Sequence, residues 1–169
     1  MTGQCSPAFR EELAALMRWR RDVRRFRTDP APEDLLARGF QAFTLAPSVG
    51  LSEPWRILRV DSAPARDACL ANFRACNARA LDGFDGDRAA TYSRLKLTGM
   101  AEAPVHLAVF CDDGTEKGHG LGALTMPETR AFSVVGAITH LWLALRAEGL
   151  GLGWVSILDP TRLARDLDV

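Results

Sequence analysis

The sequence has no surplus of charge of either sign, because 21 lysines and arginines balance 21 aspartates and glutamates over 169 residues. Proteins that bind nucleic acid or anionic membranes usually carry a positive surplus, so neither partner is expected. The longest apolar run, residues 134–147, includes His140 and is shorter than the roughly 20 residues of a membrane span. The first residues also lack the basic, apolar and small-residue series of a signal peptide. We therefore expect a cytoplasmic protein.

Metal-binding and dinucleotide-binding motifs are missing as well. The cysteines at positions 5, 69, 76 and 111 form no Cys-x-x-Cys pair and have no histidine at ligand spacing. We interpret them as reduced thiols that mostly serve packing, and we predict no metal site. The glycine fingerprint of dinucleotide-binding folds is absent. The stretch Gly-His-Gly-Leu-Gly, residues 118–122, resembles a phosphate loop only superficially, and we assign it to a mobile loop over 112–129.

The pattern of apolar residues and breakers predicts one α+β or α/β domain over residues 1–169. Ser6 and Pro7 can begin the first helix, and Asp159 and Pro160 the last. Further helices are predicted over 33–43, 64–81, 86–97 and 130–148, and strands over 56–60, 104–111 and 151–158. Glycines in the last strand indicate a close approach of another group to the backbone.

The segment 130–148 is apolar on nearly every side, so we expect this helix to be buried all round. A chain of this size rarely surrounds a helix by itself. We therefore predict that the helix lies at the interface of a homodimer. Gly149 is expected to end the helix, because glycine adopts the left-handed conformation that follows many helices.

Six arginines crowd into residues 18–27, Arg-Trp-Arg-Arg-Asp-Val-Arg-Arg-Phe-Arg, around a single carboxylate at Asp22. Guanidinium groups hold phosphate by paired, planar hydrogen bonds, so a phosphorylated small ligand suits this cluster. A solvated face with local ion pairs is the plainer alternative. Binding of nucleic acid is a third, which the balanced total charge disfavours.

Several segments together resemble a known family. In order along residues 11–169 they are RRDVRRF, APSVGLSEPW, YSRLKLTGM, EAPVHLAVFCD, TMPET and LWLALRAEGLGLGWVSILDP. They are similar to the nitroreductase-like flavoproteins, and within these to the branch that makes 5,6-dimethylbenzimidazole for cobalamin (vitamin B12). Ordinary nitroreductases commonly carry serine where Asp22 stands here. The resemblance implies a central mixed β-sheet flanked by helices, with the long helix at a homodimer interface.

The resemblance also implies a flavin site, with Asp22 and Ser156 as catalytic residues. The arginines would hold the phosphate and polar edge of FMN, and the loop near residue 48 and the strand near residue 154 would approach the flavin ring. The implied FMN-binding residues are Arg20, Arg21, Asp22, Val23, Arg24, Pro47, Ser48, Gly50, Arg88, Leu97, Gly153 and Ser156. Taken singly, Ser48 could merely cap a turn and Ser156 could be a core hydroxyl.

The implied reaction consumes its flavin. Reduced FMN reacts with O2 and is fragmented to 5,6-dimethylbenzimidazole and erythrose 4-phosphate, so FMNH2 is a substrate that a separate NAD(P)H-dependent flavin reductase would supply. Proton removal beside the sugar needs a charged base, and arginines on both sides of Asp22 would lower its pKa and keep it ionised. A serine there could not perform the same proton transfer unaided. Ser156 would hydrogen-bond the flavin or a reaction intermediate.

Two departures from the family pattern bear on this hypothesis. Glu53 stands where glutamine is common, and an acid there would either repel anionic reduced flavin or face solvent. Family chains also continue for several tens of residues beyond 168–169, so we expect the family's C-terminal extension to be absent. The predicted lid is residues 80–100 or 112–129. The alternative functions are an NAD(P)H-dependent nitro or quinone reductase and a non-catalytic FMN-binding module.

Overall fold

The first helix, α1 (Pro7–Trp19), begins where the sequence predicts. In the computed structural model, which describes residues 3–81 and 87–169, the Ser6 Oγ accepts a hydrogen bond of 3.1 Å from the Phe9 N–H. Pro7 occupies the first turn, where its missing N–H would have had no helical partner. The helix ends at the arginine cluster, with Arg20 as its C-cap.

The remaining elements confirm the predicted α+β class and most of the predicted boundaries. They are α2 (Glu33–Thr44), the 3-10 turn η1 (Val49–Leu51), β1 (Trp55–Arg59), α3 (Ala63–Leu81), α4 (Asp87–Glu102), β2 (Leu107–Cys111), α5 (Thr129–Ala147) and α6 (Pro160–Asp166). Gly149 follows α5 with φ of +82°, as expected of a glycine that ends a helix. Asp159 caps α6 by accepting a hydrogen bond of 3.0 Å from the Arg162 N–H. None of the described helices is both long and apolar enough to cross a membrane.

The sheet is smaller than predicted. Within the described residues it contains β1 and β2, which pair in antiparallel register. The Val60 N–H donates to the His106 carbonyl at 2.9 Å, and the Asp112 N–H donates to the Pro54 carbonyl at 2.6 Å. The strand expected over 151–158 is not formed, and this segment contributes one parallel bridge, from Leu152 to Asp22.

The segment 151–158 makes other contacts instead. Gly153 lies against the backbone of the Val23 segment, and the carbonyl of Trp154 accepts a hydrogen bond from the Lys96 ammonium group. The predicted close approach at a glycine is confirmed, since a Cβ on Gly153 would clash with the Val23 carbonyl oxygen.

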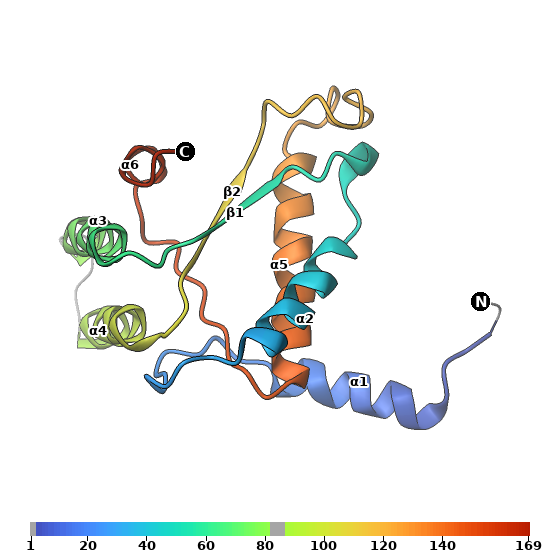
Figure 1. Ribbon diagram of the computed structural model, residues 1–169, viewed down its shortest axis with the longest axis horizontal. Helices are drawn as coiled ribbons and strands as arrows, with labels where there is room; N and C mark the ends of the chain where they lie inside the picture. Colours follow the sequence, from blue (N-terminus) through green and yellow to red (C-terminus); the bar gives the residue numbers. More distant parts are fainter. Residues whose placement is uncertain (1–2, 82–86) are drawn as a thin grey trace. The chain divides into compact units, whose positions relative to one another are not determined.

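The chain divides into two compact units, and neither is continuous in sequence. Unit 1 comprises Met1–Asp22, Pro32–Arg56 and Val109–Leu152. Its centre is the contact of α2 with α5, which lie alongside each other in Figure 1. Gly39 permits this contact, because a Cβ there would lie 2.6 Å from Cδ2 of Leu145. Phe43 and Leu141 are fully buried between these helices.

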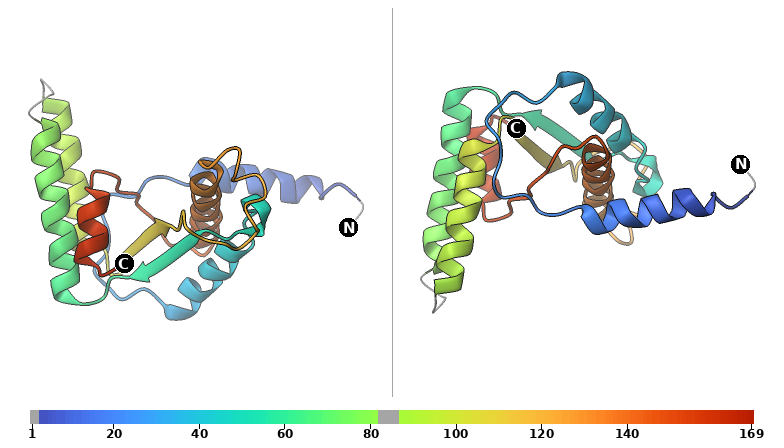
Figure 2. Two further views of the ribbon diagram at one scale, coloured as in Figure 1. Left: turned by 90° about the horizontal axis from the view of Figure 1, so that it is seen from above. Right: turned by 90° about the horizontal axis from the view of Figure 1, so that it is seen from below.

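Unit 2 comprises Val23–Ala31, Ile57–Ala108 and Gly153–Val169. Its helix α3 contacts both α4 and α6, as the two views of Figure 2 show. Phe73 on α3 is completely buried, and Asn72 beside it is 1% exposed. The Asn72 side chain donates to the Asp159 carbonyl at 2.9 Å and accepts from the Asp159 N–H at 2.8 Å. One amide therefore fixes the start of α6 on α3.

Candidate functional site

The predicted flavin-binding residues divide between the two units. Those in unit 1 are Arg20, Arg21, Asp22, Pro47, Ser48 and Gly50, and those in unit 2 are Val23, Arg24, Arg88, Leu97, Gly153 and Ser156. The chain passes from unit 1 to unit 2 between Asp22 and Val23, and again between Leu152 and Gly153. We describe the two groups in turn.

Arg20 is held by stacking at the end of α1. Its guanidinium carbon lies 4.6 Å from the centroid of the Trp142 ring of α5, and its side chain is half-buried. One turn further along α5, the guanidinium of Arg146 lies 3.3 Å from the centroid of the Trp19 ring. A guanidinium that stacks on an aromatic ring still presents its N–H groups at its edge, where a phosphate can accept them.

Arg21 and Asp22 follow directly. The Arg21 guanidinium turns back and donates to the carbonyl of Arg20 at 2.8 Å and to that of Arg18, so it satisfies carbonyls at the C-terminal end of α1. Asp22 is half-buried, and its backbone forms the parallel bridge with Leu152. The flavin contacts predicted for both residues stay predictions.

The loop around Ser48 is anchored to α5. The Val49 N–H donates to the Ser133 Oγ at 3.0 Å, and the Ser133 hydroxyl donates to the Thr129 carbonyl at 2.7 Å. The Ser48 Oγ accepts from the Glu53 N–H at 3.1 Å, which is the turn-capping role considered for it, while Pro47 is exposed. Sequence reasoning missed Ser133, because its hydroxyl is one of several on this helix and nothing in the sequence sets it apart.

Gly50 lies close to the backbone of another segment of this chain. Its φ is +56°, and a Cβ would lie 2.8 Å from the Leu121 carbonyl oxygen in the loop 112–128. Glu53 pairs with Lys117 from the same loop, so its charge is compensated within the protein. The Glu53 side chain is 43% exposed in this pair, and its effect on reduced flavin stays untested.

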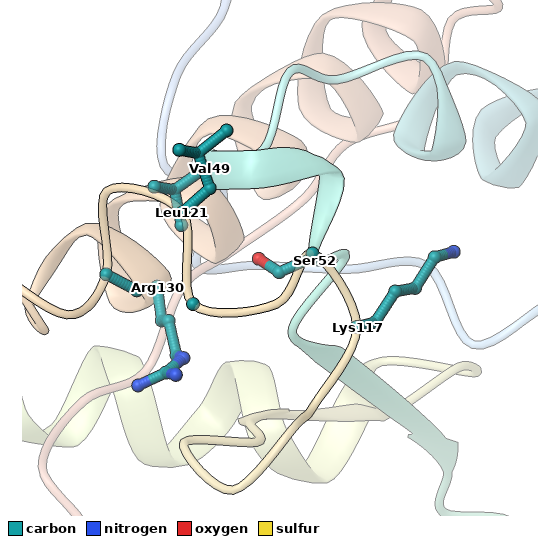
Figure 3. A pocket seen from close by; sticks show the side chains of 8 residues that line it. Val49, Ser52, Lys117, Leu121 and Arg130 are labelled. Atoms are coloured by element: carbon teal, nitrogen blue, oxygen red, sulfur yellow. The ribbon is translucent and has the colours of Figure 1, made fainter.

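A small hollow lies under this loop, between η1 and the start of α5 (Figure 3). Ser52 and Arg130 border it, whereas the Lys117 side chain extends away from the other labelled side chains. Ser52 is 4% exposed, and within the described residues neither its Oγ nor the Arg130 Nε has a hydrogen-bond partner. The hollow measures about 140 Å³ with open solvent included and is too narrow for a water molecule. Ligand pockets measure about 300–1,000 Å³, so this hollow by itself is too small to hold a flavin.

In unit 2, α4 holds the segment that follows Asp22. The Glu102 carboxylate accepts from the Phe26 N–H at 3.1 Å and lies 3.5 Å from the Arg25 Nε. Gly99 lets the segment lie close to the helix, because a Cβ there would be 2.9 Å from the Arg24 carbonyl oxygen. The backbone of Val23 and Arg24 is therefore fixed between α4 and Gly153.

The other predicted residues of unit 2 lie on α4 and after Gly153. Leu97 is half-buried on α4, and Ser156 is exposed. Arg88 belongs to α4, but its side chain lies outside the described part of the structure, as does the middle of the predicted lid at 82–86. Lys96, which sequence reasoning did not single out, donates to the Trp154 carbonyl between the two predicted flavin residues Gly153 and Ser156.

The described acids and thiols form no cluster of three or more groups that could hold a metal ion. Burial is the main cause that raises the pKa of the Cys111 thiol to about 11, with a further contribution from Asp113. Burial also raises the pKa of Cys69. Both thiols are therefore protonated at neutral pH and unsuited to act as nucleophiles. The predicted chemistry of this site therefore stays anion binding by arginine beside one carboxylate.

The sequence of residues 17–169 matches the nitroreductase family. The chain belongs to the nitroreductase family. A 5,6-dimethylbenzimidazole synthase of Rhodospirillum rubrum is 55% identical over 163 residues, which cover 96% of this chain and 77% of the relative. A protein of the same name from Rhodobacter capsulatus is 48% identical over 159 residues, covering 94% of this chain and 77% of the relative.

Solved structures of this family share the fold. Oxidised iodotyrosine deiodinase, bound to FMN and 3-iodo-L-tyrosine, superimposes with a TM-score of 0.70 at 24% identity. The match covers 92% of this chain and 80% of that one. The predicted nitroreductase-like fold is thereby confirmed, although the described sheet of this chain is limited to β1 and β2.

Proposed function

We propose that this nitroreductase-family chain is active as a 5,6-dimethylbenzimidazole synthase, which fragments reduced FMN with O2. The observation that carries the proposal is the 55% identity with a synthase over 96% of the chain. Asp22 adds to it, because it stands where reductases of the family commonly have serine. The products are 5,6-dimethylbenzimidazole and erythrose 4-phosphate, the former serving as the lower ligand of cobalamin.

Carbon counting locates the bond that must break. The ribityl chain of FMN has five carbons and erythrose 4-phosphate has four, so one ribityl carbon is left over. We take it to become the carbon between the two nitrogens of the benzimidazole, and the four carbons of the flavin's pyrimidine ring then leave as a further fragment. Cleavage therefore falls between the first and second ribityl carbons, and release of the sugar as an aldehyde requires removal of a hydroxyl proton. The bound flavin supplies the electrons that O2 accepts.

We assign the protein's part in this chemistry to the two groups described above. Arg20, Arg21 and Arg24 bind the phosphate and polar edge of the flavin, with Arg20 at the phosphate. Asp22 accepts a proton at the ribityl chain or ring. Ser156 donates a hydrogen bond to the flavin. The fixed backbone around Val23 and Arg24 supports this assignment, since catalytic groups act best when their position is set before substrate binds.

A homodimer is part of the proposal. Helix α1 has no buried residue, and it exposes an apolar stripe of Phe9, Leu13 and Met17. Phe132 and Val135 on α5 are also exposed, at 60% and 46%. These side chains support the prediction that a second copy of the chain covers apolar surface that is exposed in a single chain. Sedimentation analysis at micromolar concentration should give twice the mass of the chain, and a monomer would contradict this part.

The decisive experiment mixes the protein with chemically reduced FMN in air and analyses the products by mass spectrometry. A synthase yields 5,6-dimethylbenzimidazole in an amount that follows the loss of flavin. Consumption of NADPH driven by a nitroaromatic compound, with the flavin recovered intact, would indicate a reductase instead. Bound reduced flavin that persists for hours in air would indicate a binding module.

A further inference from the structure

Two arginine–tryptophan stacks interlock where α1 meets α5 in unit 1. Trp19 and Arg20 are consecutive at the end of α1, and Trp142 and Arg146 lie one turn apart on α5. Each helix contributes one ring and one guanidinium, so Arg20 lies over Trp142 and Arg146 lies over Trp19. From this geometry we infer that Trp142 is a positioning residue that orients Arg20 toward the phosphate of the flavin substrate, an inference that rests on the proposed function.

Arg20 needs such support because of its place in the chain. It is the C-cap of α1, with φ of −55° and ψ of 130°, so the backbone has already left the helix there. An unrestrained arginine loses about 2 kcal/mol of rotamer entropy when it is fixed. Stacking on Trp142 restricts the guanidinium before any ligand arrives. Restriction in the bound geometry raises affinity by removing this cost from the binding step.

Stacking also determines what Arg20 can bind. The ring covers one face of the guanidinium, while the N–H groups point outward in its plane. Phosphate oxygens accept such paired donors, and because the phosphate is charged it holds them more strongly than the neutral carbonyl oxygens at the polar edge of the flavin ring do. The Trp142 contact should therefore act on the phosphate end of the ligand and leave recognition of the flavin ring unchanged.

The second stack serves a different purpose. Trp19 is 56% exposed, and the Arg146 guanidinium over its ring joins the last turn of α1 to α5. Removing the Arg146 guanidinium should loosen the end of α1 but leave the contact between Arg20 and Trp142 in place. Arg146→Gln is thus a matched control, because it removes the neighbouring stack without touching the pair that orients Arg20.

The experiment compares FMN with riboflavin, which lacks the phosphate. Affinities of both oxidised flavins are measured by fluorescence quenching for the parent and for Trp142→Leu, Trp142→Phe and Arg146→Gln. A cation–π contact is worth between about 0.5 and 2 kcal/mol, so Trp142→Leu should weaken FMN about 2- to 30-fold. Riboflavin affinity should not change, Trp142→Phe should recover part of the loss, and Arg146→Gln should not reproduce the selective effect.

A second measurement separates positioning from simple stability. In the Arg20→Ala background, Trp142→Leu should have no further effect on FMN, because the group through which it acts is gone. With reduced FMN, Trp142→Leu should raise KM and leave kcat close to the parent value. Equal losses for FMN and riboflavin, or additive effects of the two substitutions, would overturn the inference, as would a parent protein that binds both flavins alike.

The inference and the proposed function fail in different ways. A parent protein that forms no 5,6-dimethylbenzimidazole refutes the function, yet the preference for FMN over riboflavin still reports on Arg20 and Trp142. Equal weakening of both flavins by Trp142→Leu refutes the inference, while product formation by the parent protein is unaffected.

Discussion

Replacing Ser133 with alanine tests how the loop around Ser48 is held on α5. Ser133 is 7% exposed, and its Oγ accepts the Val49 N–H at 3.0 Å while its hydroxyl donates to the Thr129 carbonyl at 2.7 Å. The substitution removes the acceptor of the Val49 N–H and little else. The Thr129 carbonyl keeps the partner that it has in the helix.

The expected loss combines two opposing effects. A buried donor left without its acceptor costs about 1–3 kcal/mol, and the half-buried setting of Val49 favours the lower part of this range. Alanine regains about 0.5 kcal/mol, because it has a higher helix propensity than serine. The net loss of unfolding free energy should be about 0.5–1.5 kcal/mol.

Thr139→Ala is the matched control on the same helix. The Thr139 Oγ1 also donates to the carbonyl four residues earlier, Val135, at 3.0 Å, but it is exposed. This substitution should be neutral or slightly stabilising. Urea unfolding followed by circular dichroism compares the two variants, and hydrogen exchange reports on the Val49 amide directly.

The two readouts should agree. Ser133→Ala should lower the stability relative to Thr139→Ala, and exchange of the Val49 amide should accelerate more than that of amides elsewhere in unit 1. If Ser133→Ala is as stable as Thr139→Ala and the Val49 amide exchanges at the parent rate, the loop is not held by this hydroxyl and our description of its anchoring is wrong.

Two further predictions follow from unit 2 and from the thiols. Asn72→Ala removes both partners of the Asp159 peptide groups and should cost about 2–4 kcal/mol of unfolding free energy. Asn77→Ala, on the same helix, should cost far less, because the buried Asn77 Oδ1 has no hydrogen-bond partner among the described residues. Equal losses in urea denaturation would contradict this. At pH 8 iodoacetamide should label the exposed Cys5 well before Cys111, whose pKa is about 11. Mass spectrometry of timed samples gives the order of labelling, and labelling of Cys111 first would contradict this prediction. Folding raises the pKa of Cys111 from 9.0 to about 11. The contribution of this thiol to the free energy of unfolding is therefore complete below pH 9 and is lost as the pH rises toward 11.

Local signals in the sequence predicted the helices well. Ser6 with Pro7 and Asp159 with Pro160 mark helix starts by chemistry that acts over three or four residues, and the structure has both caps. The arginine cluster and Asp22 were singled out for the same reason, since their meaning depends on residue type and immediate neighbours.

Contacts between segments that are distant in the sequence could not be predicted from such local signals. The run 151–158 has the composition of a strand, but within the described residues it pairs through one bridge. Nothing in the sequence near Lys96 or Trp154 indicates that these two residues are in contact. Likewise the stacking of Arg20 on Trp142 and the bond from Val49 to Ser133 join positions more than eighty residues apart. The pairing of Glu53 with Lys117 is a further contact between segments that are distant in the sequence.

The most direct test of the account separates flavin binding from flavin destruction at Asp22. The parent protein and Asp22→Asn are titrated with oxidised FMN, then mixed with reduced FMN in air, and 5,6-dimethylbenzimidazole is quantified over time. We predict similar FMN affinity for the two proteins and a loss of product formation of at least about 100-fold in the variant, the usual contribution of a positioned base. An Asp22→Asn protein that forms 5,6-dimethylbenzimidazole at the parent rate would contradict the role of this carboxylate.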